Sequence, residues 1–130
     1  MHIESATLLV DDYDQGIEFF VDTLGFELVA DSPAQTERGR PKRWVVVRPP
    51  GASTGIVLAR PDGAGERRRV GAQAGGRVAF FLRVTDFDAA FDRMTAAGVT
   101  FVRAPRSESY GRVAVFLDCA GNRWDLLGPN

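Results

Sequence analysis

The sequence contains one cysteine and one histidine, and it has no long hydrophobic run. The lone cysteine, Cys119, excludes an intrachain disulfide. The lone histidine, His2, lies near the start of the chain, where disorder is common, which disfavours a catalytic triad or a histidine-rich metal site. No apolar stretch approaches the roughly 20 residues of a membrane-spanning helix, and the N-terminal residues lack the features of a signal peptide. We therefore expect a cytoplasmic protein with no membrane partner.

An excess of charge of one sign is also absent. Sixteen Lys and Arg stand against seventeen Asp and Glu, which gives a net charge of -1 and argues against a nucleic-acid partner. The chain has 130 residues, of which 45% are hydrophobic, so it can form a core without metal or disulfide support. We expect a single domain spanning residues 1–130.

Periodicity predicts a βαβββ module in residues 1–62. Asp12 or Asp14 offers an N-cap for its helix, apolar side chains recur at helical spacing, and Gly25 supplies the stop. The helix is expected at 14–24, and the strands at 3–10, 26–30, 42–48 and 55–60. Residues 63–76 are rich in glycine and charge, so they are expected to form a linker with one short helical turn.

An internal repeat predicts a second module in residues 77–128. The segment 10–14 matches 84–88 at an offset of 74 residues, and 25–29 matches 98–102 at an offset of 73. A second helix is expected at 88–97, followed by the glycine stop and a short strand within 98–102, and the last strands are expected at 114–118 and 123–127. The fold class is therefore α+β, with two tandem βαβββ modules that form a curved, partly open sheet and carry their helices on its outer face.

The residues that mark the modules resemble those of the vicinal oxygen chelate superfamily. They are the strand leading into Asp12, the helix exit Leu24-Gly25-Phe26, the second aspartate Asp86, and the closing segment from Asp118 to Leu126. This superfamily includes glyoxalases, extradiol dioxygenases, fosfomycin-modifying enzymes and bleomycin-resistance binding proteins. The resemblance implies the same fold and a homodimer whose clefts form between modules of two chains.

The resemblance also implies four positions for metal ligands. In this sequence they hold Ser5, Ala79, one of the pair Ile56 and Val57, and Asp125. A single carboxylate and one hydroxyl make a poor transition-metal site, since catalytic sites usually have three protein ligands. We therefore expect no metal, no cofactor and no catalytic residue at these positions.

Without a metal, the open sheet face is expected to form a ligand pocket. Strand alternation puts Asp125 on that face and Trp124 on the helix-covered face. Trp44 is expected either as an aromatic wall or as part of the core, and Tyr110 precedes a glycine in a loop, where it can face a ligand. The expected ligand-binding residues are Ser5, Thr7, Trp44, Ala79, Phe81, Tyr110, Arg123 and Asp125.

These features favour a small-molecule-binding protein that holds an antibiotic or another aromatic organic compound, neutral or cationic, in a metal-free cleft. One alternative is a lyase, dioxygenase or isomerase of the same superfamily that acts with a divalent metal or with Asp125. Another is an interaction module without a small-molecule site. Two basic stretches, 38–43 and 67–69, favour either a solvated surface or contact with an anionic ligand.

Overall fold

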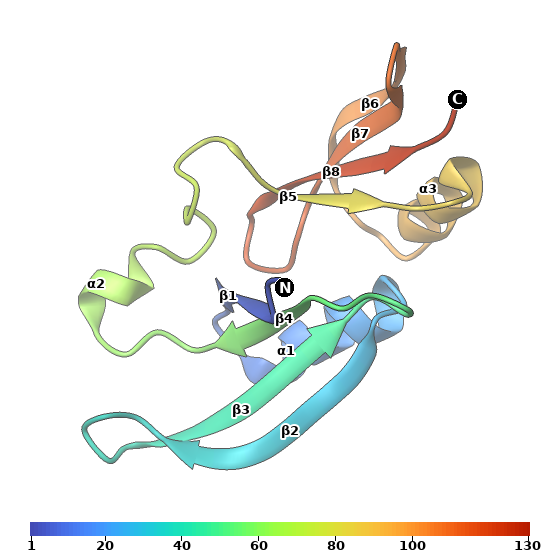
Figure 1. Ribbon diagram of the computed structural model, residues 1–130. Coiled ribbons are helices and arrows are strands. Elements are labelled where there is room, and N and C mark those ends of the chain that lie inside the picture. Colours follow the sequence, from blue (N-terminus) through green and yellow to red (C-terminus); the bar gives the residue numbers. More distant parts are fainter. The chain divides into compact units, whose positions relative to one another are not determined.

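The computed structural model describes residues 1–130, and the chain divides into two compact units, Met1–Gly71 and Ala72–Asn130 (Figure 1). The division falls inside the segment expected to be a linker. Each unit contains one open four-stranded mixed sheet and one helix that follows its first strand. The predicted α+β fold class with two tandem βαβββ modules is confirmed.

The first unit has the strand order β1-β4-β3-β2. The parallel pair is β1 with β4, and the other neighbours are antiparallel. Its elements are β1 (Ser5–Leu9), α1 (Tyr13–Ile17), η1 (Glu18–Thr23), β2 (Glu27–Gln35), β3 (Pro41–Arg48), β4 (Gly55–Ala59) and α2 (Ala64–Arg67). The short helix α2 is the single helical turn expected between the modules.

The second unit repeats this topology with the strand order β5-β8-β7-β6, and here β5 runs parallel to β8. Its elements are β5 (Val78–Arg83), α3 (Phe87–Ala96), β6 (Phe101–Glu108), β7 (Gly111–Leu117) and β8 (Arg123–Gly128). None of the helices in either unit has the length and apolar character that crossing a membrane requires.

Both main helices begin at an aspartate cap. The Asp12 side chain accepts a hydrogen bond from the backbone N–H of Gln15 at 2.9 Å, and Asp86 accepts one from Ala89 at 3.0 Å. Asp12 is thus the N-cap, and the helices begin at Tyr13 and Phe87, one residue earlier than expected. Gly25 and Gly98 follow with positive φ, the conformation in which the glycine stop was expected.

The first helix differs from the expected α-helix at 14–24. It is α-helical only over Tyr13–Ile17 and continues as a π-helix over Glu18–Thr23. The repeat offset gives the reason, because the first copy has one residue more than the second between its cap and its glycine. The extra residue is absorbed as a wider turn, in which the N–H of Leu24 donates to the carbonyl of Phe19, five residues earlier, at 3.0 Å.

Two strand predictions were too short. β2 extends to Gln35 and β6 to Glu108, although both contain a proline, Pro33 and Pro105, which lowers strand propensity. Both are edge strands, where a proline interrupts no ladder on the open side. Pairing with β3 and β7 therefore extends the strands beyond what local propensity indicates.

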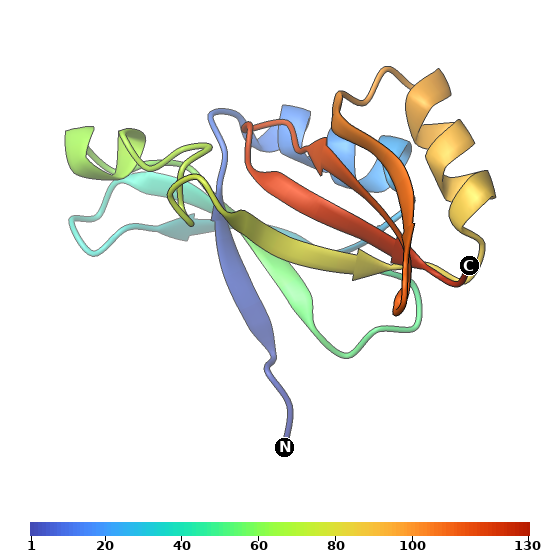
Figure 2. The ribbon, with the colours of Figure 1, turned by 90° about the horizontal axis from the view of Figure 1, so that it is seen from above.

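The N-terminal residues before β1 project from the first sheet (Figure 2). His2 is exposed, and its Nε2 lies 3.4 Å from Oε2 of the exposed Glu4. The prediction that His2 is a solvent-exposed terminal residue is confirmed. The strand expected from residue 3 begins at Ser5 instead.

Each unit has its own apolar core on the helix-covered face of its sheet. In the second unit Trp124 is 3% exposed, and its ring centroid lies 4.5 Å from that of Phe80 and 5.7 Å from that of Phe116. The expected core position of Trp124 is therefore confirmed. Fully buried side chains of the first core include Leu8, Phe20, Val45, Val47 and Leu58.

Candidate functional site

The face of the second sheet opposite Trp124 carries a row of paired residues. Phe81 on β5 pairs with Asp125 on β8, Asp125 pairs with Val115 on β7, and Val115 pairs with Arg103 on β6. Paired residues point to the same face of a sheet, so the four side chains share one surface. Phe81 is 65% exposed. An accessible aromatic ring therefore stands beside a carboxylate, as the strand alternation predicts.

The Asp125 carboxyl is influenced by two arginines as well as by burial. Partial burial raises the pKa of Asp125 above its usual value, and the positive charges of Arg106 and Arg103 act in the opposite direction. These arginines were not among the expected site residues. They lie on β6, in the part of the strand beyond its expected end, so no local pattern indicated that they lie near Asp125.

Arg106 is itself held by a second carboxylate. Its Nε lies 2.8 Å from Oε1 of Glu108, a hydrogen bond that raises the pKa of Arg106, and Tyr110 contributes in the same direction. The Nη1 atom of Arg106 is buried and has no hydrogen-bond partner. Tyr110 stands in the two-residue turn between β6 and β7 and is 57% exposed. The structure thus brings Tyr110, Arg106 and Asp125 into one electrostatic cluster.

The other two expected residues of this unit lie at the margin of the row. Ala79 falls where the register between β5 and β8 shifts, so it has no partner in the regular ladder. Arg123 is exposed at the first position of β8. Phe81, Tyr110 and Asp125 are therefore the members of the expected set that the second unit groups most closely.

In the first unit the corresponding sheet face is uncharged along the same row. Thr7 on β1 pairs with Val57 on β4, which pairs with Val46 on β3, while Ser5 pairs with Gly55. Trp44 is 46% exposed, so it does not belong to the buried core.

Trp44 instead lines an open pocket of about 590 Å³ in the first unit. The pocket is built from the loop between β2 and β3, the first half of β3, and the segment from the end of β4 to α2. Its lining residues are Tyr13, Thr36, Glu37, Arg38, Arg40, Pro41, Lys42, Arg43, Trp44, Val57, Leu58, Ala59, Arg60, Pro61, Asp62 and Glu66. Ser5 and Thr7 do not reach it.

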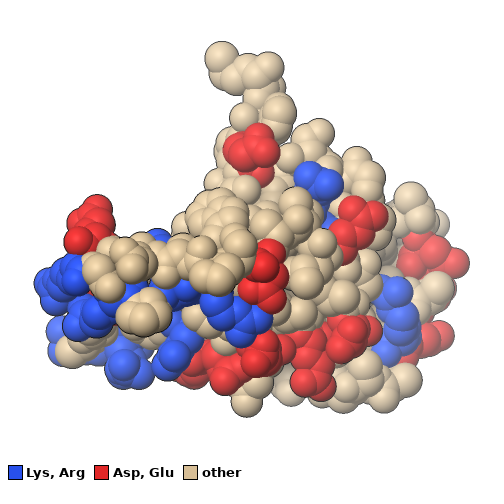
Figure 3. Space-filling model, turned by 90° about the horizontal axis from the view of Figure 1, so that it is seen from below, with Lys and Arg blue, Asp and Glu red and all other residues tan.

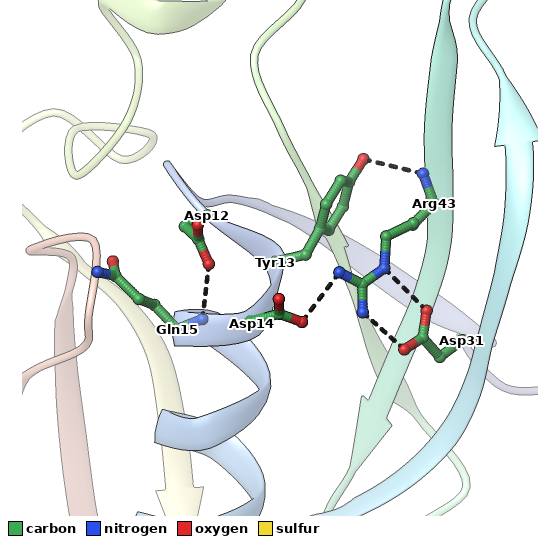
Figure 4. A network of polar contacts seen from close by, with 6 residues as sticks. All are labelled: Asp12, Tyr13, Asp14, Gln15, Asp31 and Arg43. Atoms are coloured by element: carbon green, nitrogen blue, oxygen red, sulfur yellow. Dashed lines mark hydrogen bonds and ion pairs between the residues drawn. The ribbon is translucent and has the colours of Figure 1, made fainter.

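Arg43 is one of the residues that line this pocket, and its side chain is the centre of a polar network (Figure 4). Its guanidinium donates to both carboxylate oxygens of Asp31, at 3.0 and 2.7 Å, and to Asp14 at 2.9 Å. It also lies over the ring of Tyr13, 5.2 Å from the centroid, and the Tyr13 hydroxyl accepts from the Arg43 backbone N–H at 3.3 Å. One side chain therefore ties the start of α1 to β2 and β3.

This contact changes the titration of both partners. The hydrogen bond from Arg43 lowers the pKa of Asp31, and the bonds to Asp31 and Asp14 raise the pKa of Arg43. The guanidinium keeps its charge. Its hydrogen bonds fix the segment of β3 in which Lys42 precedes Arg43 and Trp44 follows it. In the sequence, Arg43 stands out only as part of the basic stretch 38–43.

The residues at the four implied metal positions do not fit a metal site. The strand pairing makes Val57 the counterpart of Asp125, because Thr7 and Phe81 are equivalent in the repeat. Ser5, Val57 and Ala79 leave Asp125 as the sole carboxylate. Within either unit, no group of three His, Cys, Asp or Glu side chains is close enough to hold a metal ion.

Known proteins share this architecture over nearly their whole length. An uncharacterized protein of Shewanella frigidimarina is 47% identical over 129 residues, which cover 98% of this chain and 93% of that protein. The crystal structure of TnmS3, described as an antibiotic binding protein from a Streptomyces species, is 32% identical with a TM-score of 0.77, covering 100% of this chain and 97% of that one. A superfamily member from Sphaerobacter thermophilus is also 32% identical with a TM-score of 0.77, covering 98% and 97% of the two chains.

The family comparison agrees with the repeat found in the sequence. Residues 2–126 match the family described as Glyoxalase/Bleomycin resistance protein/Dioxygenase superfamily, a span that covers both βαβββ units except the end of β8. The resemblance carried by the aspartate caps, the glycine stops and the closing strand is therefore confirmed, and the chain belongs to this superfamily.

Proposed function

We infer that the chain is a small-molecule-binding protein of the glyoxalase and bleomycin-resistance type, with a metal-free cleft for an aromatic organic compound. The observation that carries this inference is the surface around Phe81 and Asp125. An exposed ring and a partly buried carboxylate lie side by side, where metal-using relatives would need further ligands. A concave or open face with one aromatic surface and few polar groups suits a planar ligand.

The relatives support binding rather than a particular reaction. TnmS3 is described as an antibiotic binding protein and is 32% identical to this chain over its full length. An antibiotic is therefore the class of ligand to test first.

The arginines near Asp125 bear on the charge of that ligand. Arg103 and Arg106 both favour the ionised carboxylate, so its negative charge is already balanced in part. Of the neutral and cationic aromatic ligands expected from the sequence, this balance favours the neutral one. We place a neutral ligand here, with its ring against Phe81 and a hydrogen-bond donor toward Asp125. Tyr110, Ala79 and Arg123 border the surface, while Ser5 and Thr7, which belong to the sheet of the first unit, stay predicted ligand-binding residues.

Titration calorimetry against a panel of polycyclic aromatic antibiotics, in the presence of EDTA, tests this function. Phe81→Ala is expected to weaken the best ligand by roughly 0.5–1.5 kcal/mol beyond the loss of buried area, because an aromatic pair is lost. Val29→Ala removes an exposed apolar group from β2 and is the control. Asp125→Asn tests the carboxylate, with the exposed Asp92→Asn as its control. Equal affinities in Phe81→Ala and Val29→Ala, or binding that disappears with EDTA, would contradict the proposal.

Acid–base catalysis at Asp125 is the second candidate, because burial raises the pKa of this carboxyl and so makes it a stronger base. Mass spectrometry of a bound compound after prolonged incubation separates the two functions. An unchanged ligand supports binding, and a product that Asp125→Asn no longer forms supports catalysis.

The homodimer and the cytoplasmic location stay predictions. Light scattering on the purified chain tests the first, since a dimer would have twice the 14.2 kDa mass of one chain. Cell fractionation tests the second.

A further inference from the structure

Half of the basic residues of this chain lie in two short segments of the first unit. Residues 36–44 and 57–69 contain eight of the sixteen Lys and Arg but three of the seventeen Asp and Glu. The local charge is therefore strongly positive in a chain whose net charge is -1. Figure 3 shows these basic side chains gathered into one patch, and both segments line the pocket that contains Trp44.

The cations of the pocket fall into two groups. Arg40 is paired with Asp62, Arg43 with Asp14 and Asp31, and Nε of Arg60 donates to the backbone carbonyl of Asp11 at 3.0 Å. Arg38 and Lys42, in contrast, have no ion pair or side-chain hydrogen bond in the structure, and both are exposed. Two lining cations are thus free to meet a ligand.

Two of the three acidic residues in the lining are already engaged. Asp62 is paired with Arg40, and Glu66 accepts a hydrogen bond from the Asp62 backbone N–H at 3.0 Å. Glu37 alone lacks such a contact. The free charge at the pocket therefore remains positive, since Arg38 and Lys42 outweigh Glu37.

The largely polar lining of the same pocket also includes aromatic and apolar side chains. Trp44 offers a half-exposed indole, and Pro41, Val57, Ala59 and Pro61 add uncharged surface. The volume of about 590 Å³ is in the range of small-molecule sites. A flat ring can stack on the indole while an attached anionic group meets the cations.

We propose that this pocket binds a planar aromatic molecule that carries a carboxylate or phosphate, with the ring stacked on Trp44 and the anion held by Arg38 and Lys42. The pocket shares no lining residue with the surface around Phe81 and Asp125. The proposal therefore stands apart from the function inferred for that surface, because this pocket takes an anionic ligand and that surface a neutral one.

Tryptophan fluorescence tests the proposal directly, because Trp44 is 46% exposed and the second tryptophan, Trp124, is 3% exposed. The probes are 2-naphthoate, its neutral amide, adenosine monophosphate and inorganic phosphate. Naphthoate should bind about tenfold or more tightly than the amide, since a hydrogen bond to a charged group is lost in the amide. Phosphate alone should bind more weakly than the aromatic anions. The comparison of naphthoate with the nucleotide tells whether the anion is a carboxylate or a phosphate.

The double variant Arg38→Gln/Lys42→Gln should lose about tenfold in affinity for the aromatic anion while the amide is unaffected. The matched control is Arg68→Gln/Arg69→Gln, which removes the same charge from the same patch outside the pocket lining. Asp125→Asn should change nothing, which separates this site from the proposed antibiotic surface. Trp44→Leu, followed by calorimetry, should weaken both naphthoate and amide.

The proposal is overturned if the control double variant loses as much affinity as Arg38→Gln/Lys42→Gln, because binding would then depend on the patch and not on the pocket. It is equally overturned if the amide binds as well as naphthoate, or if no probe changes the fluorescence at millimolar concentration. Folding of the variants is checked by circular dichroism, and both replaced side chains are exposed and unpaired.

Discussion

The two units use the same contact between helix and sheet, but the first unit builds it with more hydrogen bonds. In the second unit Arg112 pairs with Asp88 and lies over the ring of Phe87, 4.6 Å from its centroid. In the first unit Arg43 occupies the equivalent strand position and lies over Tyr13. An arginine that stacks on the first aromatic residue of the helix and pairs with the acid after it is therefore a repeated element of this fold.

The difference between the two contacts lies in the added partners. Arg43 also binds both oxygens of Asp31, and Tyr13 has a hydroxyl where Phe87 has none. The first unit thereby fixes β2, the strand that begins the long hairpin next to the pocket. The comparison indicates that the arginine contact shared by both units holds the helix against its sheet. The additional hydrogen bonds of Arg43 and Tyr13 hold the strands of the first unit in position.

The connections between the last two strands differ even more. In the second unit a buried carboxylate, Asp118, accepts hydrogen bonds from the backbone N–H groups of Ala120 and Asn122, both at 2.9 Å. It also accepts from Asn122 Nδ2 at 3.1 Å and from Trp124 Nε1 at 2.8 Å. The connection from Pro49 to Thr54 in the first unit has no carboxylate in its sequence. The closing motif that helped to identify the family is therefore a structural element that orients β8, and with it Asp125.

The largest predicted effect is at this turn. Asp118→Ala leaves several buried donors without an acceptor, each costing about 1–3 kcal/mol, so we expect the free energy of unfolding to fall by about 3–5 kcal/mol. Urea unfolding measures it, with the exposed Asp92→Ala as control. A loss of less than about 1 kcal/mol would show that the Asp118 hydrogen bonds do not hold the second unit together.

The next effect separates the two hairpins. Both contain a glycine with positive φ, Gly39 at +77° and Gly111 at +128°. A Cβ at Gly111 would lie 2.3 Å from the carbonyl oxygen of Gly128, whereas a Cβ at Gly39 meets no atom within 4 Å. Gly39→Ala should cost about 1 kcal/mol for the backbone alone, and Gly111→Ala roughly 2–4 kcal/mol because the backbone must also move. Equal shifts in thermal unfolding would contradict the structure.

A smaller effect is expected from shortening the helices. Deleting Asp22 removes one exposed residue from η1 and lets this helix take the α-helical path of α3, so the free energy of unfolding should change by no more than about 1 kcal/mol. The helix α3 has no extra residue, so deleting the exposed Asp92 shortens it below the length that it needs. This deletion should lower the free energy of unfolding by roughly 2 kcal/mol more than the deletion of Asp22 does. Equal losses would mean that the extra residue is not what makes η1 a π-helix.

The smallest effect concerns pH. Because Arg43 lowers the pKa of Asp31, this pair stabilises the folded chain at pH values above the ordinary pKa of an aspartate, and the stabilisation is lost as the pH falls through the lowered value. Asp31→Asn should therefore lower the midpoint of urea unfolding at pH 7 and have less effect toward pH 2. Arg112→Gln, which breaks a single pair, should have a smaller effect at pH 7 than Arg43→Gln. Neither result would be expected if both pairs were fully screened by solvent.

Several features of the fold were predictable because their signals are local. The caps Asp12 and Asp86 and the stops Gly25 and Gly98 act within one helical turn, and strand alternation assigned Trp124 to the core and Asp125 to the open face. The lengths of β2 and β6 were not predictable in this way, because Pro33 and Pro105 speak against a strand and only the neighbouring strands overrule them.

The candidate site was predictable only in part, for a related reason. Phe81 and Asp125 follow from alternation, but the position of Arg103 and Arg106 depends on β6 continuing past its bulges. Trp44 was recognised as a residue with two possible roles, and its exposure excludes the core. The pocket beside it could not be foreseen, because its lining residues, from Tyr13 to Glu66, are up to 53 positions apart in the sequence.

The two βαβββ units, the approximate ends of their helices, and the lack of ligands at the implied metal positions can all be predicted from the amino-acid sequence alone. Each of these depends on residue identity or on a short-range period. The tertiary structure decided how the extra residue of the first helix is accommodated, which acids pair with Arg43, and which cations beside Trp44 remain free. These outcomes depend on contacts between distant segments, where geometry selects one partner among several of equal charge.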